Sequence, residues 1–448
     1  MKRLMYLVGL TIGLLSNAPV SAQNCSKGYS WEADLHHRLL VDFCKDEKSV
    51  LDYIHRYIPN VTETQMRTWE KSGALELRVI DGEKRYFHNA APNLFRIDKT
   101  CMAIKLKKDG EALEGSEKAD MENVPKIISN APSNQKRLAE PKKIKVKYTL
   151  TVKADAVPDG ETIRCWLPFP RTDVARQQNV KLLSTSESQY QRSPVDCAHS
   201  SVYMERKAEA GKPTVFSEEF EYVSYGSWFN MLSKSVKPYD TSSALYKKYT
   251  SERDRHIVFT PRLRQLADSL TQGVTNPVIK AQRIFKWIND NFPWASAREY
   301  STIENIPEYV LENHHGDCGQ VTLLFLTLCR ISGIPAHFES GFMLHPNAEN
   351  LHDWGEIYFE GIGWVPVDMS FGIPTYAKNE NEKWFFLGGI DSWRMVVNSD
   401  FGECFSPVKK WPRSETVDFQ RGEVEWQGGN LYFDKWSWDL EVIKCREE

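Results

Sequence analysis

The sequence predicts an α+β protein in which a small mixed module and a β-sandwich precede a core built from a helix bundle and an antiparallel sheet. Three observations predict this fold class. Apolar and polar residues alternate from Ile144 to Val152, which is typical of a strand. Apolar residues recur at helical spacing between Ala281 and Ile288. An almost wholly apolar run over residues 321–329 indicates a helix buried in a core, and a hairpin pattern follows it.

The first residues have the pattern of a secretory signal peptide. Lys2 and Arg3 precede an apolar run from Leu4 to Leu15, and small residues end at Ala22, where cleavage is expected. This run is too short for a membrane span, and no other stretch approaches the length that a span requires. We therefore expect a signal peptide over residues 1–22 and a secreted or periplasmic protein without a transmembrane segment.

Length, charge and cysteine content narrow the classes of function. The 448 residues suggest about three domains at roughly 150 residues each, and the formal net charge is −3. Mild acidity argues against nucleic acid as a partner, because phosphate binding needs a concentrated basic surface. The nine cysteines include no Cys-x-x-Cys pair, so neither a structural zinc site nor a thioredoxin-type site is indicated. An odd number leaves at least one thiol free outside the cytoplasm, and the pairing of the others stays open.

The N-terminal part of the mature chain divides into a module and a connecting segment. Residues 23–106 are predicted to form a small α+β module, since two segments with helical spacing precede a hairpin whose turn is Asp81-Gly82. Residues 107–142 are polar and interrupted by prolines, which predicts a linker.

The rest of the chain is predicted to form three further parts. Strand patterns over residues 143–240 indicate a β-sandwich, whose expected role is scaffolding or surface binding. Residues 241–374 become helical and form the predicted core, in which Asn276-Pro277 begins a helix. Aromatic-rich runs over residues 375–448 predict a C-terminal β-rich extension packed on the core.

Cys318 is the candidate nucleophile. Gly316 and Asp317 permit a turn and an N-cap before the buried apolar run, which ends at Gly333. Cys318 therefore lies at the start of the predicted helix, where free N–H groups and the helix dipole lower a thiol pKa and can stabilise an oxyanion. A buried structural cysteine is the commoner fate of a lone cysteine, and we interpret Cys329 in that way.

His352 and Asp368 are the candidate base and the acid that orients it. Strand patterns flank a turn at residues 360–363, and the midpoint between His352 and Asp368 falls beside this turn. A hairpin pivoting there brings the two opposite each other, whereas a tight turn on Gly361-Ile362 shifts the register and requires a bulge or a diagonal reach. In contact with His352, Asp368 would fix its tautomer while the imidazole takes the thiol proton of Cys318.

Other histidines give weaker alternatives. His337 and His345 have no carboxylate placed for them in the sequence pattern. A zinc site could be drawn from His314, Cys318 and His352, but it lacks ligand pairs at the usual spacings. The sequence therefore predicts no metal and no cofactor.

The run from Ala281 to Asp368 resembles the core of the transglutaminase-like superfamily, whose members are related to papain-type cysteine proteases. The resemblance rests on five ordered elements: Trp287 through Trp294, Gly316-Asp317-Cys318, Gly333-Ile334-Pro335, His352 with Trp354 and Glu356, and Gly363, Trp364, Pro366 and Asp368. The family triad maps onto Cys318, His352 and Asp368. The resemblance covers residues 245–372 and implies a papain-like fold for this core.

The resemblance implies an enzyme that attacks a peptide or protein amide and forms a thioester, and the signal-peptide pattern adds the expectation that it is exported. The thioester is resolved by water or by an amine, and water is the default because excluding it takes extra structure. One alternative is a non-catalytic surface binding protein that retains the scaffold. Another makes the N-terminal module or the linker an inhibitory segment. Substrate identity and oligomeric state stay open.

Overall fold

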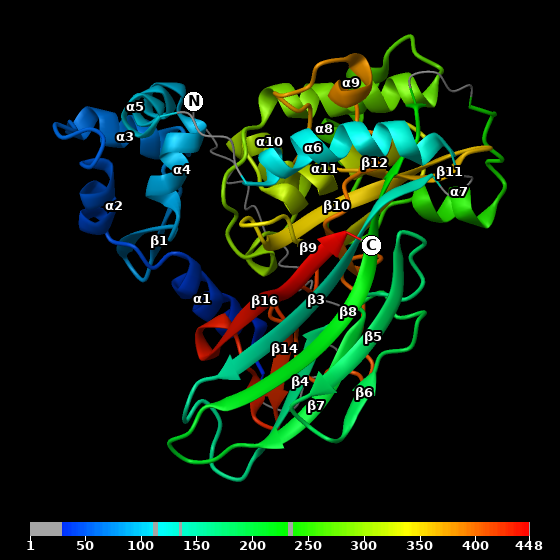
Figure 1. Ribbon diagram of the computed structural model, residues 1–448. Helices are drawn as coiled ribbons and strands as arrows, with labels where there is room; N and C mark the ends of the chain where they lie inside the picture. Colours follow the sequence, from blue (N-terminus) through cyan, green and yellow to red (C-terminus); the bar gives the residue numbers. More distant parts are fainter. Residues whose placement is uncertain (1–28, 111–114, 134–136, 232–235, 448) are drawn as a thin grey trace, which may run out of the picture.

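The computed structural model describes residues 29–110, 115–133, 137–231 and 236–447. The predicted signal peptide lies outside these ranges. The fold is α+β with antiparallel sheets, as the sequence predicts (Figure 1). Among the helices that these residues form, none has both the length and the apolar character needed to cross a bilayer.

The N-terminal module contains five helices and one hairpin. Its elements are α1 (Trp31–Asp42), α2 (Glu47–Ile54), α3 (Glu63–Lys71), β1 (Leu77–Ile80), β2 (Glu83–Tyr86), α4 (Ala90–Ile97) and α5 (Lys99–Asp109). Ile80 pairs with Glu83 across the turn, where Asp81 and Gly82 both have positive φ, at 53° and 80°. A two-residue turn of this kind requires positive φ at both positions, which is why the Asp-Gly pair predicted the hairpin.

Helix α6 (Gly115–Asn130) occupies much of the segment that the sequence predicts to be a linker. The linker prediction is therefore wrong for these residues. The helix buries Val124 and Ile127 completely, and Ile127 packs so closely on Gly226 that a Cβ there would lie 2.3 Å from its Cδ1. The pattern escaped prediction because Pro125 lies inside the helix and much of the buried face is polar, including Asp120. A short 3-10 turn, η2 (Ala131–Ser133), follows.

Two five-stranded sheets form a sandwich that draws strands from residues 138–228 and from residues 389–447. The first has the order β12-β8-β3-β16, with β5 also paired to β8, and consists of β3 (Leu138–Val152), β5 (Gln177–Thr185), β8 (Thr214–Trp228), β12 (Gly389–Ile390) and β16 (Trp436–Glu447). The second has the order β15-β14-β4-β7-β6 and consists of β4 (Thr162–Pro168), β6 (Tyr190–Arg192), β7 (Ser201–Lys207), β14 (Glu423–Trp426) and β15 (Gly429–Asn430). The alternating apolar residues of β3 are buried in one hydrophobic cluster that both sheets share.

The sequence predicts that the C-terminal segment forms one extension packed on the core. This prediction is wrong. Strand β16 pairs with β3 and β14 pairs with β4, so both complete the sandwich. Strand β13 (Arg394–Asn398) instead pairs with β9 (Ala336–Met343) of the core sheet. The aromatic-rich runs showed that strands were present there, but their partners lie far away in the sequence. The short helix α12 (Glu380–Lys383) precedes β12, and the 3-10 turn η5 (Phe433–Lys435) precedes β16.

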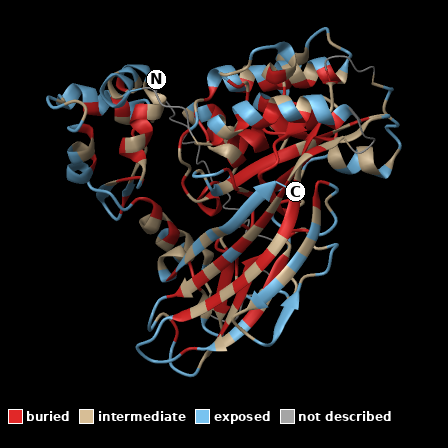
Figure 2. Ribbon diagram, viewed as in Figure 1, coloured by how far each residue is buried: buried red, intermediate tan, exposed pale blue. Residues whose placement is uncertain are grey.

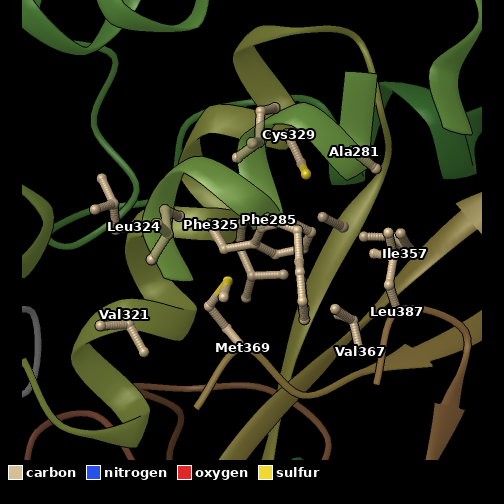
Figure 3. Close-up of a cluster of buried hydrophobic side chains, with 14 of the residues drawn as sticks. Ala281, Phe285, Val321, Leu324, Phe325, Cys329, Ile357, Val367, Met369 and Leu387 are labelled. Atoms are coloured by element: carbon tan, nitrogen blue, oxygen red, sulfur yellow. The ribbon is translucent and has the colours of Figure 1, made fainter. Parts of the chain in front are cut away.

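The core packs helices against a four-stranded sheet of order β11-β10-β9-β13. Its elements are α7 (Ala244–Tyr249), α8 (Pro261–Thr271), α9 (Pro277–Asn291), η4 (Tyr300–Thr302), α10 (Ile306–Asn313), α11 (Cys318–Ile331), β9 (Ala336–Met343), β10 (Asn350–Phe359) and β11 (Gly363–Val367). Helix α11 is buried on nearly every side, as its sequence predicts (Figure 2). In Figure 3, Phe325 and Cys329 of α11 lie beside Phe285 of α9 and Ile357 of β10. This packing fixes α11 relative to the sheet.

Candidate active site

Cys318 is the first residue of α11, as the sequence predicts. The carboxylate of Asp317 accepts a hydrogen bond from the Gln320 backbone N–H at 3.0 Å, and the Gln320 side chain accepts one from the Asp317 N–H at 3.2 Å. This reciprocal capping box satisfies two N–H groups at the start of the helix and holds Cys318 in place.

The environment of the thiol differs from the sequence prediction. Burial, together with the carboxyl groups of Asp353 and Asp317, raises the pKa of the Cys318 thiol well above its ordinary value. The helix dipole acts in the opposite direction, but it is outweighed here by burial and two nearby acidic groups. Cys318 is therefore a protonated thiol at neutral pH in this structure.

His352 and Asp368 form a hydrogen-bonded pair. Nε2 of His352 lies 2.7 Å from Oδ2 of Asp368. Strands β10 and β11 pair Gly355 with Val367, and this register places Trp354, not His352, opposite Asp368. The contact is a diagonal reach across the hairpin. Phe359 pairs with Gly363, so the turn comprises residues 360–362 and is not the tight Gly361-Ile362 turn that the sequence allowed.

The surroundings of the pair keep His352 neutral and Asp368 ionised. Burial raises the pKa of Asp368, but His352, Arg394 and hydrogen bonds outweigh it and hold the pKa below its ordinary value. Oδ1 of Asp368 accepts N–H bonds from Ser370 and Phe371 at 3.1 and 3.0 Å, and Nη1 of Arg394 lies 2.8 Å from its Oδ2. Burial lowers the pKa of His352 and outweighs the attraction of Asp368.

The thiol of Cys318 is hydrogen-bonded to Asp353, the residue that follows His352. It donates a hydrogen bond to Oδ2 of Asp353 at 3.4 Å, and no hydrogen bond between the described residues joins Cys318 to His352. Successive residues of a strand point to opposite faces of a sheet. Asp353 faces α11, whereas His352 faces Asp368 and the ring of Phe371. The structure thus brings together Cys318 with Asp353 and His352 with Asp368, but does not join the two pairs.

Asp353 is a site residue that the sequence prediction missed. Gln420 donates to its Oδ1 at 2.8 Å, and the hydroxyl of Tyr300 lies 3.4 Å from its Oδ2. Burial raises the pKa of Asp353 well above its ordinary value, and the carboxyl groups of Asp418 and Asp317 raise it further. The sequence signal was only an acidic residue in the strand next to His352, because the pattern does not show which face α11 covers.

A chain of buried charges connects the His352–Asp368 pair to α6. Arg394 forms ion pairs with both Asp368 and Asp391. Nε2 of His345 lies 3.3 Å from Oδ1 of Asp391 and 3.2 Å from Oδ1 of Asp120 in α6. Burial lowers the pKa of His345, but the two carboxylates outweigh it and raise the pKa above its ordinary value.

Two histidines therefore have acid partners that the sequence pattern did not reveal. His345 has Asp120 and Asp391, and Nε2 of His337 lies 3.0 Å from Oε2 of Glu356. The prediction that His337 and His345 have no carboxylate partner is therefore wrong for both histidines. The partners come from other elements of the fold, which sequence spacing alone does not place.

The group of Asp120, His345 and Asp391 also has the separations of metal ligands. Their ligand atoms lie within 4.8 Å of one another, and no other such group occurs in the described ranges. Arg394 already compensates the charge of Asp391, so these residues fit an ion-pair network better than a site for a divalent cation. The combination of His314, Cys318 and His352 does not form such a group.

Asp317 gives the site a pH-dependent stability that can be measured. Burial raises the pKa of Asp317 to about 6. A raised carboxyl pKa stabilises the folded state fully below the unfolded value near 3.8, and this contribution is lost as pH rises through about 6. Asn also caps helices well, so Asp317→Asn should gain stability over wild type by up to about 3 kcal/mol between pH 4 and pH 7.

Urea unfolding of wild type and Asp317→Asn across this pH range tests the expectation. Asp46→Asn is the matched control, because Asp46 caps exposed α2 and lies far from these buried carboxyls in the sequence. A stability difference for Asp317→Asn that does not change with pH would contradict the raised pKa.

Solved structures and a curated protein show similarity to this chain. A candidate cysteine protease from Cytophaga hutchinsonii is 15% identical with a TM-score of 0.47, and the similarity covers 69% of this chain and 92% of that one. The periplasmic domain of TgpA from Pseudomonas aeruginosa is 15% identical with a TM-score of 0.29, covering 54% and 90%. The uncharacterized protein YebA of Bacillus subtilis (strain 168) is 26% identical over 135 residues, which span 26% of this chain and only 18% of that protein.

The comparison with protein families gives a match in the core of the protein. The model of the transglutaminase-like superfamily matches residues 264–369, from within α8 to just beyond the end of β11. Cys318, His352 and Asp368 all lie inside this stretch. Residues 264–369 of the chain are therefore similar to the core of the transglutaminase-like superfamily.

Proposed function

We propose that this protein is an exported enzyme that cleaves or transfers amide groups of peptides or proteins through a thioester on Cys318. One observation carries the proposal: Cys318 begins a capped helix in the same superfamily core that pairs His352 with an ionised Asp368. The signal-peptide pattern at residues 1–22 supports export.

His352 is the proposed base. Its Nε2 is bonded to Asp368, so Nδ1 is the ring nitrogen left to accept the thiol proton. In the resting structure the thiol is bonded to Asp353, and the reaction therefore requires Cys318 to exchange this partner for His352. Asp368 stabilises the imidazolium that forms, since its own pKa is held low.

The remaining steps follow from acyl-transfer chemistry. The Cys318 thiolate attacks the amide carbonyl, and the N–H groups at the start of α11 stabilise the oxyanion. His352 returns the proton to the leaving amine as the carbon–nitrogen bond breaks, which leaves the thioester. Water deprotonated by His352 then attacks the thioester and regenerates the thiol. An amine in place of water would give transamidation.

A second candidate function is a non-catalytic binding protein that retains this core. The observation that favours it is the resting contact of Cys318 with Asp353, because this contact and burial keep the thiol protonated.

Trapping the acyl-enzyme separates the two functions. The full-length protein is mixed with a peptide library and quenched in acid, and adducts are located by mass spectrometry. We expect an acyl group on Cys318 in wild type and none in Cys318→Ala. Cys329→Ala is the matched control, since Cys329 is buried in the same helix and should leave acylation intact. Undiminished turnover by Cys318→Ala would refute the enzyme proposal.

A further inference from the structure

A cavity of about 740 Å³ lies between the N-terminal module and the core. Its walls come from α1, β1, the segment 254–258 and the residues of η4 and α10. The lining does not include Cys318, His352 or Asp368. A cavity of this size can accommodate a short peptide.

Arg298 provides buried positive charge in this cavity. The residue is 6% exposed, and its guanidinium lies over the ring of Tyr309 with 5.0 Å to the centroid. Its nearest carboxylate is Glu76, at 3.5 Å from Nε. Nε and Nη1 are buried without a hydrogen-bond partner, so the guanidinium retains unused donors. Buried donors of a charged group are costly to leave unpaired.

Arg78 contributes a second guanidinium to the same lining. It is half-buried over the ring of Phe43, 5.5 Å from the centroid, and forms no ion pair within 4 Å among the described residues. Burial and the charge of Arg298 lower the pKa of Arg78. The carboxylate of Glu76 is shared between Arg298 and Tyr309, because its Oε2 accepts a hydrogen bond from the Tyr309 hydroxyl at 2.9 Å. This part of the cavity therefore has more positive than negative charge.

We propose that this cavity binds the carboxylate of a peptide through Arg78 and Arg298. A guanidinium binds a carboxylate through two parallel N–H···O bonds, which would use the free donors of Arg298. Elsewhere the lining carries four carboxylates and one further arginine: Asp254, Glu304, Glu308, Glu312 and Arg255. These carboxylates repel a polyanion but suit the ammonium or basic side chain of a zwitterionic peptide. The choice of a peptide rests on the proposed function, whereas the carboxylate rests on the two arginines.

The cavity also reaches the turn that supports the nucleophile's helix. Ser301 and Thr302 of η4 line it. Tyr300 of the same turn donates a hydrogen bond to Oδ1 of Asp317, the N-cap of α11, at 2.7 Å. A bound peptide would therefore contact the same turn that holds the cap before Cys318.

Calorimetric titration of the full-length Cys318→Ala protein tests the proposal without turnover. The ligands are Ala-Ala-Ala, its C-terminal amide, and the amides of Ala-Glu-Ala and Ala-Gln-Ala, with inorganic phosphate as a further probe. We expect a peptide with a carboxylate to bind about tenfold or more tightly than its amide counterpart. Comparing Ala-Ala-Ala with its amide tests binding of a C-terminal carboxylate. Comparing the amides of Ala-Glu-Ala and Ala-Gln-Ala tests binding of a side-chain carboxylate. Tighter binding of the acid in either comparison supports the proposal.

Substitution of the arginines locates the binding. Arg298→Gln and Arg78→Gln should each weaken the favoured peptide about tenfold or more. Arg67→Gln, which removes an exposed charge from the same module, should not. Circular dichroism verifies that each variant is folded, and Arg78→Gln, at a half-buried position, decides the matter if Arg298→Gln unfolds.

Three outcomes would overturn the proposal: equal binding of acids and amides, unchanged binding by both arginine variants, or phosphate binding as tightly as the peptide. None of them affects the acyl-enzyme on Cys318, so failure of this inference and failure of the proposed function are distinguishable.

Discussion

His352→Ala is expected to lower the rate of acylation by about 10⁴- to 10⁶-fold, the range seen when a catalytic triad loses its base. Removing the imidazole leaves Asp368 with no role in proton transfer and the thiol bonded only to Asp353. The burial that keeps the thiol protonated makes the loss severe, since spontaneous thiolate is scarce. Single-turnover kinetics with a peptide substrate identified in the acyl-enzyme trapping experiment measure this rate directly.

Asp353→Asn is the matched control for His352→Ala, because it changes the adjacent residue on the opposite face of β10. Asparagine keeps the size of the side chain and can donate an N–H bond to a thiolate. We expect Cys318 to be alkylated faster at neutral pH in this variant and acylation to remain within about tenfold of wild type. The reverse pattern, with Asp353→Asn inactive and His352→Ala active, would assign the base to Asp353.

Arg394→Met is expected to destabilise the protein by about 3–5 kcal/mol, because it leaves two buried carboxylates without their cation. Arg394 is fully buried and pairs with both Asp391 and Asp368. Methionine fills a similar volume, so the lost charge rather than a cavity dominates. The free energy of unfolding in urea at pH 7 provides the measurement.

The stability that Arg394→Met loses should also become smaller as the pH falls. The pKa of Asp391 and that of Asp368 are held low in the folded protein, so their pairing stabilises it above the unfolded values near 3.8. This contribution falls as pH decreases toward the folded values, and the gap between wild type and Arg394→Met should narrow with it. Arg394→Lys, which keeps the charge but not the planar fork, should recover part of the loss. A gap below about 1 kcal/mol at pH 7 would show that the network does not depend on Arg394.

The sequence was sufficient where the cause of a structure is local. Cys318 could be placed at a helix start because Asp317 and the apolar run adjoin it. The hairpin at Asp81-Gly82 could be predicted because the turn itself requires those residues. Contact between His352 and Asp368 could be anticipated from their positions on either side of the turn, but its diagonal geometry follows from the strand register, which the sequence did not determine.

Features that depend on packing between distant segments could not be predicted in this way. His345 pairs with Asp120 from 225 positions away, on a helix whose polar buried face looked like a linker. Asp353 was passed over because a strand pattern states which residues share a face but not which helix covers it. The same uncertainty hid the contact of Cys318 with Asp353.

The pairing of β16 with β3 also constrains the order in which the chain can fold. Asp439 lies opposite Thr149, so the first sandwich sheet joins one of the earliest strands to the last one. Contacts across so many residues form slowly, because the intervening chain must first be brought together. A ribosome would still hold β16 after β3, β8 and the whole core had been synthesised. One side of β3 therefore stays unpaired until β16 has left the ribosome, which exposes the nascent chain to aggregation at that strand.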